Sequence, residues 1–233
     1  NYENNIRIFP SISTTVSYPM IKFNKQNNIL FEPVTQIIYT ADNNDNDKVK
    51  NQDSLEVKLM SSNFLVKNKY SGDDRKEVGL RVNYGTNVSF RGINGSSNNF
   101  IFGRSYLDKK LDQFDYKNGF SDKNSDFIGN YSMILPNNNK LYYDFRFSED
   151  LDLNRNRIKT NFAIGKSILN INYIQIKNFA SRNNSDTEQI SYGLERDFFQ
   201  DWKLSFSQHR DLAGATFSSP FKSSAGLIFE NDC

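Results

Sequence analysis

The sequence predicts an all-β protein: an antiparallel up-and-down transmembrane β-barrel, of which this chain supplies a partial set of about eleven strands. Three observations lead to this fold class. Apolar and polar residues alternate with a period of two in many long stretches, as in strands with one apolar and one wet face. The connections between these stretches are alternately short and long. Aromatic residues, which favour strands, are abundant, with 20 Phe and 12 Tyr among 233 residues.

The stretch LYYDFRFSED, residues 141–150, shows the alternation most clearly. One face of the predicted strand is apolar and consists of Leu141, Tyr143, Phe145 and Phe147. The opposite face is polar and consists of Tyr142, Asp144, Arg146 and Ser148. In a membrane barrel the apolar face meets lipid, and the polar face lines a water-filled lumen.

Alternation and turn signals also predict the other strands. The predicted ranges are 10–18, 29–39, 77–91, 99–107, 126–135, 140–149, 157–165, 168–178, 188–196, 201–209 and 221–229. The best helical candidate is 53–65, where we expect a short helix or an irregular loop. Pro33 lies inside the second predicted strand, so we expect a bulge or a local break in pairing there, or a strand that begins after it.

The connections between the predicted strands follow a parity. Short connections fall at 24–28, 92–98, 136–139, 165–167 and 197–201. Long ones fall at 40–76, 108–125, 150–156, 179–187 and 210–220. An outer-membrane barrel with its tight turns at one end has this pattern, whereas a Greek-key sandwich has no need of it. We expect 40–76 to fold over or into the outer mouth of the barrel.

About eleven strands is an odd set, whereas bacterial barrels normally have an even number. We therefore expect residues 1–233 to be one part of the barrel domain of a larger protein. The net charge of +2 gives no reason to expect nucleic acid. No apolar run is long enough for a transmembrane helix, and the first residues do not resemble a signal peptide. The single cysteine, Cys233, is the last residue, which excludes an internal disulfide and a cysteine metal site.

Two patterns in the sequence resemble chemical sites. Ser205, Ser207, His209 and Asp211 share one face of a predicted strand, as a lipid hydrolase would require, although a polar lumen or rim histidine is the favoured interpretation. DNNDND, residues 42–47, resembles a calcium loop but lacks the glycine and the final glutamate of that motif. We expect no catalytic residue, cofactor or metal ion.

Several stretches, in order, resemble the C-terminal barrel of the lipopolysaccharide-assembly protein LptD family, also called organic solvent tolerance protein OstA. The most specific are the E-P-x-x-Q strand at 32–36, the N-x-D-S and G-x-D-R motifs within 51–75, and the ending E-N-D-C at 230–233. Further similar stretches are FGRSYL (102–107), SDFIGNYSMI (125–134), LYYDFRFSEDL (141–151), INYIQIKN (171–178) and EQISYGLERDFFQDWKLSFSQHRDL (188–212).

The resemblance implies a barrel of about twenty-six strands, preceded by a periplasmic jelly-roll-like domain. Such a protein accepts lipopolysaccharide from a periplasmic bridge protein and releases it into the outer leaflet of the cell outer membrane. An LptE-type lipoprotein plugs the barrel. On this reading the periplasmic domain, the early strands and the last one or two strands lie outside this chain.

The resemblance also bears on single residues. Cys233 matches a family cysteine that forms a disulfide to the periplasmic domain, so its partner would lie outside this chain; a free thiol is the alternative. The lumen-facing candidates are Arg81, Asp144, Arg146, Lys159 and Lys203. The basic ones would suit phosphorylated sugars, and the alternative is general lumen polarity with internal ion pairs.

We therefore expect a transport scaffold in the outer membrane of a Gram-negative bacterium, and not an enzyme. The alternatives are a passive porin or surface adhesin barrel, a barrel lipid hydrolase that uses His209, and a soluble lectin-like sandwich. Solute conductance, loss of activity on His209→Ala, and recovery in the aqueous fraction would identify these three.

Overall fold

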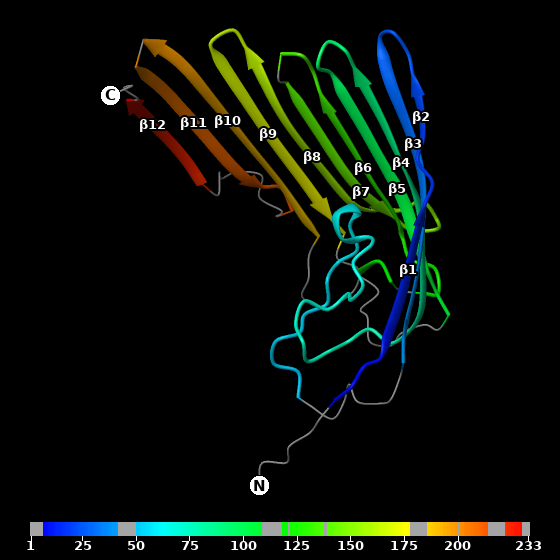
Figure 1. Ribbon diagram of the computed structural model, residues 1–233. Coiled ribbons are helices and arrows are strands. Elements are labelled where there is room, and N and C mark those ends of the chain that lie inside the picture. The colour runs from blue at the N-terminus through cyan, green and yellow to red at the C-terminus, as the bar shows by residue number, and fades with distance from the viewer. Residues whose placement is uncertain are drawn as a thin grey trace.

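The computed structural model describes residues 7–41, 50–108, 118–120, 122–137, 139–177, 186–199, 201–213 and 222–229. Its strands form one antiparallel sheet, in which the first two strands both pair with the third and every later strand lies beside its neighbours in the sequence (Figure 1). The described chain is all-β, and its sheet is not closed into a barrel, as predicted for part of a larger barrel. No helix among the described residues is long and apolar enough to span a membrane.

The described residues form twelve strands of 4 to 14 residues. They are β1 (Ser11–Ser17), β2 (Met20–Phe23), β3 (Asn27–Thr40), β4 (Gly79–Gly92), β5 (Ser97–Leu107), β6 (Phe127–Ile134), β7 (Lys140–Phe147), β8 (Leu153–Ile164), β9 (Ser167–Ile176), β10 (Thr187–Phe199), β11 (Trp202–Asp211) and β12 (Lys222–Phe229). All eleven predicted strands are present within a few residues of their expected bounds. The additional strand, β2, continues β1 along the same edge of β3.

The break between β1 and β2 lies opposite Pro33. Ser17 pairs with Val34 and Met20 pairs with Phe31, so the register is the same on both sides of the break. The Tyr18 amide donates to the Pro33 carbonyl at 3.1 Å, but proline has no N–H to return the bond. The predicted local break in pairing is therefore confirmed, and it falls on the neighbouring strand while β3 itself continues.

The tight connections lie at one end of the sheet. Figure 1 shows the β2–β3, β4–β5, β6–β7, β8–β9 and β10–β11 turns together at the top, so the connections that follow β3, β5, β7, β9 and β11 start from the opposite end of the sheet. The predicted parity is confirmed. The longest of these connections joins β3 to β4; its described residues are 41 and 50–78, and the segment 50–78 is here called the covering loop. It contains one short 3-10 turn, η1 (Ser61–Asn63), so the helical candidate at 53–65 is an irregular loop with one helical turn.

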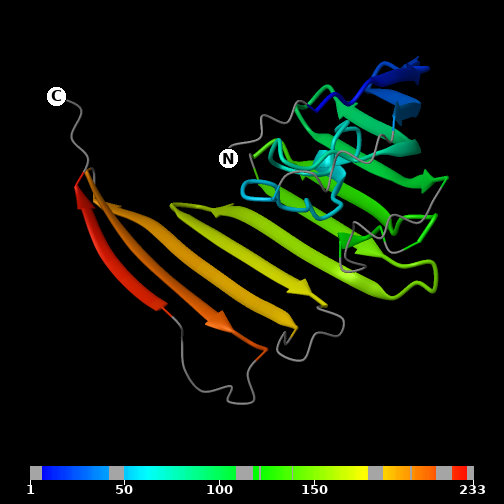
Figure 2. The same cartoon turned by 90° about the horizontal axis from the view of Figure 1, so that it is seen from below.

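The sheet is curved, and the covering loop lies on its concave side (Figure 2). The six residues of the buried apolar cluster are Leu59, Phe64, Tyr70, Leu107, Phe120 and Ile128. Three of them come from the covering loop and two from β5 and β6. The hydrophobic core of the described chain is thus the contact between the loop and the concave face.

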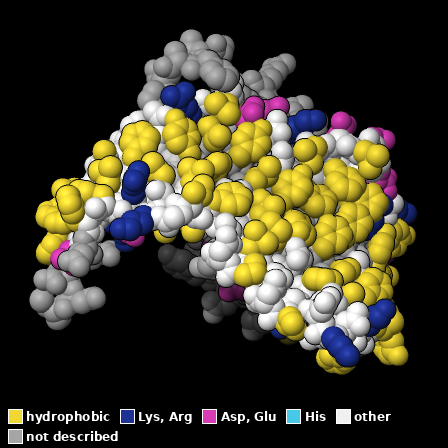
Figure 3. Space-filling view, turned by 90° about the horizontal axis from the view of Figure 1, so that it is seen from above, with side chains coloured by type: hydrophobic (Ala, Val, Ile, Leu, Met, Phe, Trp, Pro, Cys, Tyr) yellow, Lys and Arg dark blue, Asp and Glu magenta, His cyan; other side chains and the backbone are white. Residues whose placement is uncertain are grey.

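The convex face is apolar and rich in aromatic rings (Figure 3). A group of rings crosses β5, β6 and β7, with neighbouring centroids 5.2–6.2 Å apart; its members are Phe100, Phe102, Phe127, Phe145 and Phe147. The ring of Phe145 covers Gly129, where an added Cβ would lie 2.1 Å from the ring. A glycine is therefore required beneath this ring, and the ring shields the glycine backbone.

Candidate functional site

The concave face is polar and has two halves. The covering loop lies over the half formed by β4–β7, and a trough lies along the half formed by β7–β12. The convex face, in contrast, exposes many large apolar side chains, among them Phe31, Ile37, Tyr39, Tyr84, Leu204, Phe206 and Leu227. A large exposed apolar surface marks a contact with a membrane or another protein.

A ladder of hydrogen bonds crosses the concave side of β1, β3, β4 and β5. Gln36 Nε2 donates to Thr15 Oγ1 at 3.0 Å, and Asn83 Nδ2 donates to Gln36 Oε1 at 2.7 Å. Ser105 Oγ donates to Asn83 Oδ1 at 2.7 Å, and the Ser105 amide donates to Ser125 Oγ at 2.7 Å. Asn83, Ser105 and Ser125 are fully buried, so these bonds satisfy groups that would otherwise be costly to bury. Gln36, the last residue of the E-P-x-x-Q motif, joins two strands in this ladder.

The covering loop is closed on itself by the Asp53 carboxylate. This carboxylate accepts hydrogen bonds from the amides of Asp73 at 3.2 Å and Asp74 at 3.0 Å, and from Ser54 Oγ at 2.9 Å. The two amides, followed by the hydroxyl, lower the pKa of Asp53 to about 2 because they stabilise the ionised form. A Cβ on Gly72 would lie 2.4 Å from Asp53 Oδ1, so only glycine fits beside it. The N-x-D-S and G-x-D-R motifs are therefore the two sides of one loop closure.

Arg81 ties the covering loop to β4. Its Nη2 donates to the carbonyls of Val66 at 2.7 Å and Lys67 at 3.1 Å, and its Nη1 forms an ion pair with Glu77. The side chain is 1% exposed. The structure thus places Arg81 on the concave face but beneath the loop, where it anchors the backbone of residues 66–67.

Asp144 and Arg146 tie the loop and the strands together on β7. Asp144 Oδ2 accepts from Ser61 Oγ at 3.0 Å, and Asp144 Oδ1 accepts from Arg155 Nε at 2.9 Å. Arg146 Nε lies 3.2 Å from Asp126 Oδ2. Both Asp144 and Arg146 are buried, and both form ion pairs within the protein, so on this half of the concave face the alternative of internal ion pairs holds.

Lys69 is a buried amine inside the covering loop. Its Nζ donates to the carbonyls of Asn63 and Phe64, the latter at 3.2 Å, and lies 5.9 Å from the centre of the Phe120 ring. Burial lowers the pKa of Lys69 to about 7, and the nearby charge of Arg81 acts in the same direction, while that of Glu77 opposes both.

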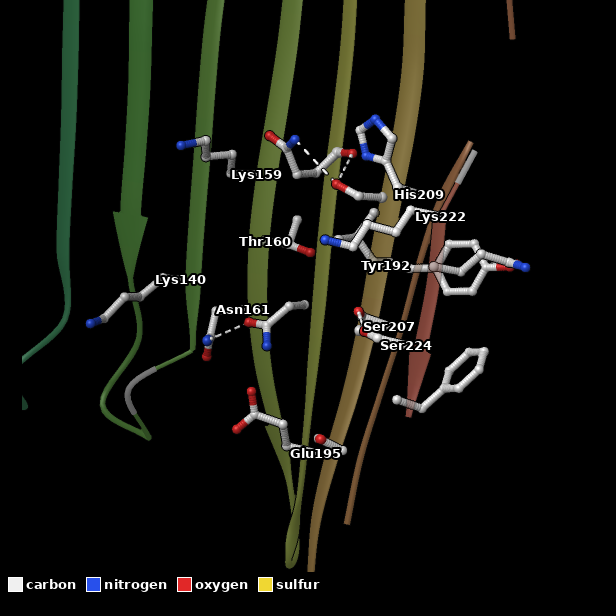
Figure 4. Close-up of a pocket in the computed structure, with 18 of the residues that line it drawn as sticks. Lys140, Lys159, Thr160, Asn161, Tyr192, Glu195, Ser207, His209, Lys222 and Ser224 are labelled. Atoms are coloured by element: carbon white, nitrogen blue, oxygen red, sulfur yellow. Dashed lines mark hydrogen bonds between the residues drawn. The ribbon is translucent and has the colours of Figure 1, made fainter. Parts of the chain in front are cut away.

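The trough is the open half of the concave face and has a volume of about 760 Å³. Hydroxyl and amide side chains from β8–β12 line it, including Asn161, Asn170, Asn172, Ser191, Ser207 and Ser224 (Figure 4). Four cationic side chains lie around it, Lys140, Arg157, Lys159 and Lys222, with one carboxylate, Glu195. Arg157 Nε and Asn172 Oδ1 are buried atoms for which no described residue supplies a hydrogen-bond partner. The trough therefore offers positive charge and hydrogen-bonding capacity to a polar, anionic molecule.

Of the five lumen-facing candidates, the structure brings only Lys159 to the trough. Lys203 pairs with Asp197 and Ile228 in the register of β11 and is half-exposed beyond the trough. Sequence reasoning did not single out Lys140, Arg157 and Lys222. The strand alternation could have indicated two of them, because Lys140 lies on the same face of its strand as Asp144, and Arg157 on the same face as Lys159. Lys222 is the register partner of His209, on the neighbouring strand.

The proposed chemical sites have these places in the structure. His209 lines the trough opposite Ser191 and Lys222. Ser207 Oγ lies 2.7 Å from Ser224 Oγ, and Ser205 Oγ donates to the Gly226 carbonyl at 3.3 Å. Within the described ranges no group of three or more His, Cys, Asp or Glu side chains could hold a metal ion. Cys233 and residues 42–47 lie outside the described residues.

The sequence was compared with known proteins. A model of the family LptD, LPS transport system D, matches residues 3–209, which is most of the chain. No curated protein matches the sequence directly. The family match agrees with the independent observations of an up-and-down sheet, an apolar convex face and a polar concave face. The chain therefore belongs to the LptD family of lipopolysaccharide transport proteins.

Proposed function

We propose that this chain is part of the barrel wall of an outer-membrane translocon that assembles lipopolysaccharide into the outer leaflet. The observation that carries the proposal is the contrast between the faces of one sheet. Aromatic and aliphatic side chains cover the convex face, and the concave face holds a polar trough with four cations and one carboxylate. Such a wall suits acyl chains outside and phosphorylated sugars inside.

The sheet needs further strands to work in a bilayer. Its edges at β1 and β12 have backbone groups without a strand partner among the described residues, and a bilayer offers no water to satisfy such groups. In the proposal, residues 1–233 belong to the barrel domain of a longer protein that closes the sheet. That protein receives its cargo from a periplasmic bridge protein, holds an LptE-type lipoprotein plug and forms a disulfide through Cys233.

The trough supplies the contact with the sugar part of the cargo. Lys140, Lys159 and Lys222 come from three strands and surround a surface of hydroxyl and amide groups (Figure 4). Lysine is a flexible point charge that binds phosphate without a fixed geometry. This suits a passage along which an anionic sugar moves and from which it must also leave.

The experiment depletes the full-length protein in its native host and restores it as the wild type or as the triple variant Lys140→Gln, Lys159→Gln, Lys222→Gln. Newly made lipopolysaccharide at the cell surface is then measured. We expect depletion to stop surface delivery and the triple variant to restore it several-fold less well than the wild type. The control is Lys22→Gln, Lys25→Gln, Lys166→Gln, which removes the same charge at the tight-turn end of the sheet and should restore delivery fully.

The alternative is a passive porin or surface adhesin, which the apolar and polar faces alone would also fit. In that case depletion leaves surface lipopolysaccharide unchanged and lowers solute uptake or adhesion. Unchanged delivery after depletion would overturn the proposed function. Equal delivery by the triple variant and its control would overturn the assignment of the trough only.

A further inference from the structure

Arg104 is a charged residue on the apolar convex face. It belongs to β5, where Phe100, Phe102 and Arg104 alternate with the concave residues Ile101 and Gly103. Among the described strands β4–β9 it is the only charged residue at a convex position. A charge on a lipid-facing surface is unfavourable, so such a residue points to a function.

The guanidinium group of Arg104 is held in a fixed position. Its Cζ lies 4.2 Å from the centre of the Phe127 ring, in a cation–π contact. Its Nε and Nη2 donate to the Ser125 carbonyl at 3.2 and 2.7 Å. Nη1 has no hydrogen-bond partner among the described residues, and Arg104 is 8% exposed. The Nη1 end of a fixed cation is therefore available to a group at the surface.

Glu149 adds the opposite charge to this place. Its Oε1 accepts from Arg104 Nη2 at 2.7 Å, and its side chain is 56% exposed. It lies in the turn between β7 and β8, at the end of the sheet opposite the tight turns (Figure 1). The two charges cancel, so a net anion that approached Arg104 would also meet a carboxylate. A group that carries one negative and one positive charge can pair with both.

A small apolar hollow extends from Arg104 toward the tight turns. Arg104 and Tyr84 are register partners, and Phe102 and Thr86 are the next convex pair in that direction. These side chains and Phe127 line the hollow, which has a volume of about 90 Å³. An unfilled hollow loses attractive contacts with the atoms that line it, and in a bilayer an acyl chain is the group that can fill it.

We propose that Arg104, Glu149 and this hollow form a binding site for one membrane lipid with a zwitterionic phosphoethanolamine headgroup. The phosphate accepts from Arg104 Nη1, the ammonium donates to the Glu149 carboxylate, and one acyl chain enters the hollow. Hollow, cation and carboxylate follow one another along the wall, as acyl chain, phosphate and ammonium do in such a lipid. The site rests on the proposed function for its setting, since it requires the convex face to lie in a bilayer.

Binding is measured by native mass spectrometry of the purified full-length protein, with phosphatidylethanolamine or phosphatidylglycerol added at equal concentration. We expect the wild type to bind one phosphatidylethanolamine several-fold more tightly than phosphatidylglycerol. Arg104→Gln should weaken phosphatidylethanolamine binding several-fold, because the phosphate loses its cation. The matched control is Arg196→Gln, at an exposed cation on the convex face of β10 near the tight turns, which should bind like the wild type.

Glu149→Gln tests the selectivity for the headgroup. It removes the negative charge but keeps Arg104, so phosphatidylglycerol should bind about as tightly as phosphatidylethanolamine. A purely structural role of the ion pair would not change this ratio, and folding is checked by the heat-dependent migration typical of barrels. Equal binding of the two lipids by the wild type, or an unchanged preference in Glu149→Gln, would overturn the site.

Thr86→Phe tests the hollow. The added ring occupies the space of the acyl chain, so both lipids should bind several-fold more weakly while their ratio stays that of the wild type. Val88→Phe, at the next convex position of β4, adds the same ring outside the hollow and should bind both lipids normally. Unchanged binding by Thr86→Phe would contradict the assignment of the hollow to an acyl chain.

Surface lipopolysaccharide, measured in depleted cells that carry Arg104→Gln, separates this inference from the proposed function. We expect normal delivery together with weakened phosphatidylethanolamine binding, because the site lies on the outside of the wall. Unchanged lipid binding by Arg104→Gln overturns the lipid site alone. Delivery that continues after depletion of the protein overturns the translocon proposal and leaves the measured lipid binding as it is.

Discussion

Lys69 is an ionisable side chain that is completely buried, and its pKa is about 7. The stability of the covering loop therefore depends on pH. The ordinary pKa of lysine is 10.5, so between pH 7 and 10.5 the unfolded loop binds more protons than the folded one. The stability of the folded loop therefore rises with pH across this window. Below pH 7 both states are protonated, and Lys69 adds no further pH dependence.

We predict that Lys69→Met removes this pH dependence and weakens loop docking. The carbonyls of Asn63 and Phe64 lose their buried donor, which costs about 1–3 kcal/mol per unsatisfied group. The measurement is the rate of limited proteolysis within residues 50–78 of the purified full-length protein between pH 7 and 9.5, expressed relative to the wild type. Lys67→Met, at an exposed neighbouring lysine, is the control and should follow the wild type at every pH.

Asp53 has the opposite dependence. Its folded pKa of about 2 lies below the ordinary aspartate value of 3.8, so the stability that it contributes is present above pH 3.8 and is lost as the pH falls toward 2. The loop closure therefore loosens in acid, whereas the Lys69 contribution changes only above pH 7. Two residues of one loop thus give two separate pH windows.

At the scale of the strand, Pro33 decides where the edge of the sheet is interrupted. We predict that Pro33→Val restores the missing N–H and joins β1 and β2 into one continuous edge strand. Hydrogen exchange of residues 18–23, measured by mass spectrometry on the full-length protein, should become slower. Exchange in β4 should not change, because the proline carbonyl bonds to Tyr18 on the other side. Unchanged exchange at 18–23 would mean that another residue, such as Pro19, maintains the break.

The strands could be predicted because each one carries its own alternation, so a local pattern is enough to find it. The break at Pro33 was equally local. The covering loop could not be predicted in the same way, since its contacts join distant parts of the sequence. Ser61 and Asp144 are 83 residues apart, and the residues that flank either one in the sequence do not indicate that the two are in contact.

The site was predictable only in part for the same reason. Arg81 and Lys159 have the same place in a strand alternation, and nothing in their local sequence distinguishes them. Only the docked loop makes the difference, because it turns Arg81 into a buried anchor and leaves Lys159 in the trough. Cations that line the open trough and cations that bind the protein itself become distinct only when the tertiary structure is known.

At the scale of the whole molecule, a charged substitution should have different effects on the two faces of the sheet. We predict that Phe102→Lys, on the convex face of β5, lowers the amount of folded protein in the outer membrane. A lysine facing lipid near the bilayer midplane costs about 2–4 kcal/mol. Ile101→Lys, at the adjacent concave position, is the control and should assemble far better. The measurement is the heat-modifiable fraction in isolated outer membranes, and equal loss in both variants would contradict the assignment of the faces.

The location of the hydrophobic core has a consequence for the order of folding. From β3 onward each strand pairs with its sequence neighbour, so hairpins can form one after another. The apolar cluster, in contrast, exists only after residues 59, 64 and 70 have reached β5 and β6. We therefore expect the sheet to assemble first and the core last. The core should also open first under mild denaturation, as a separate unit of lower stability than the wall on which it rests.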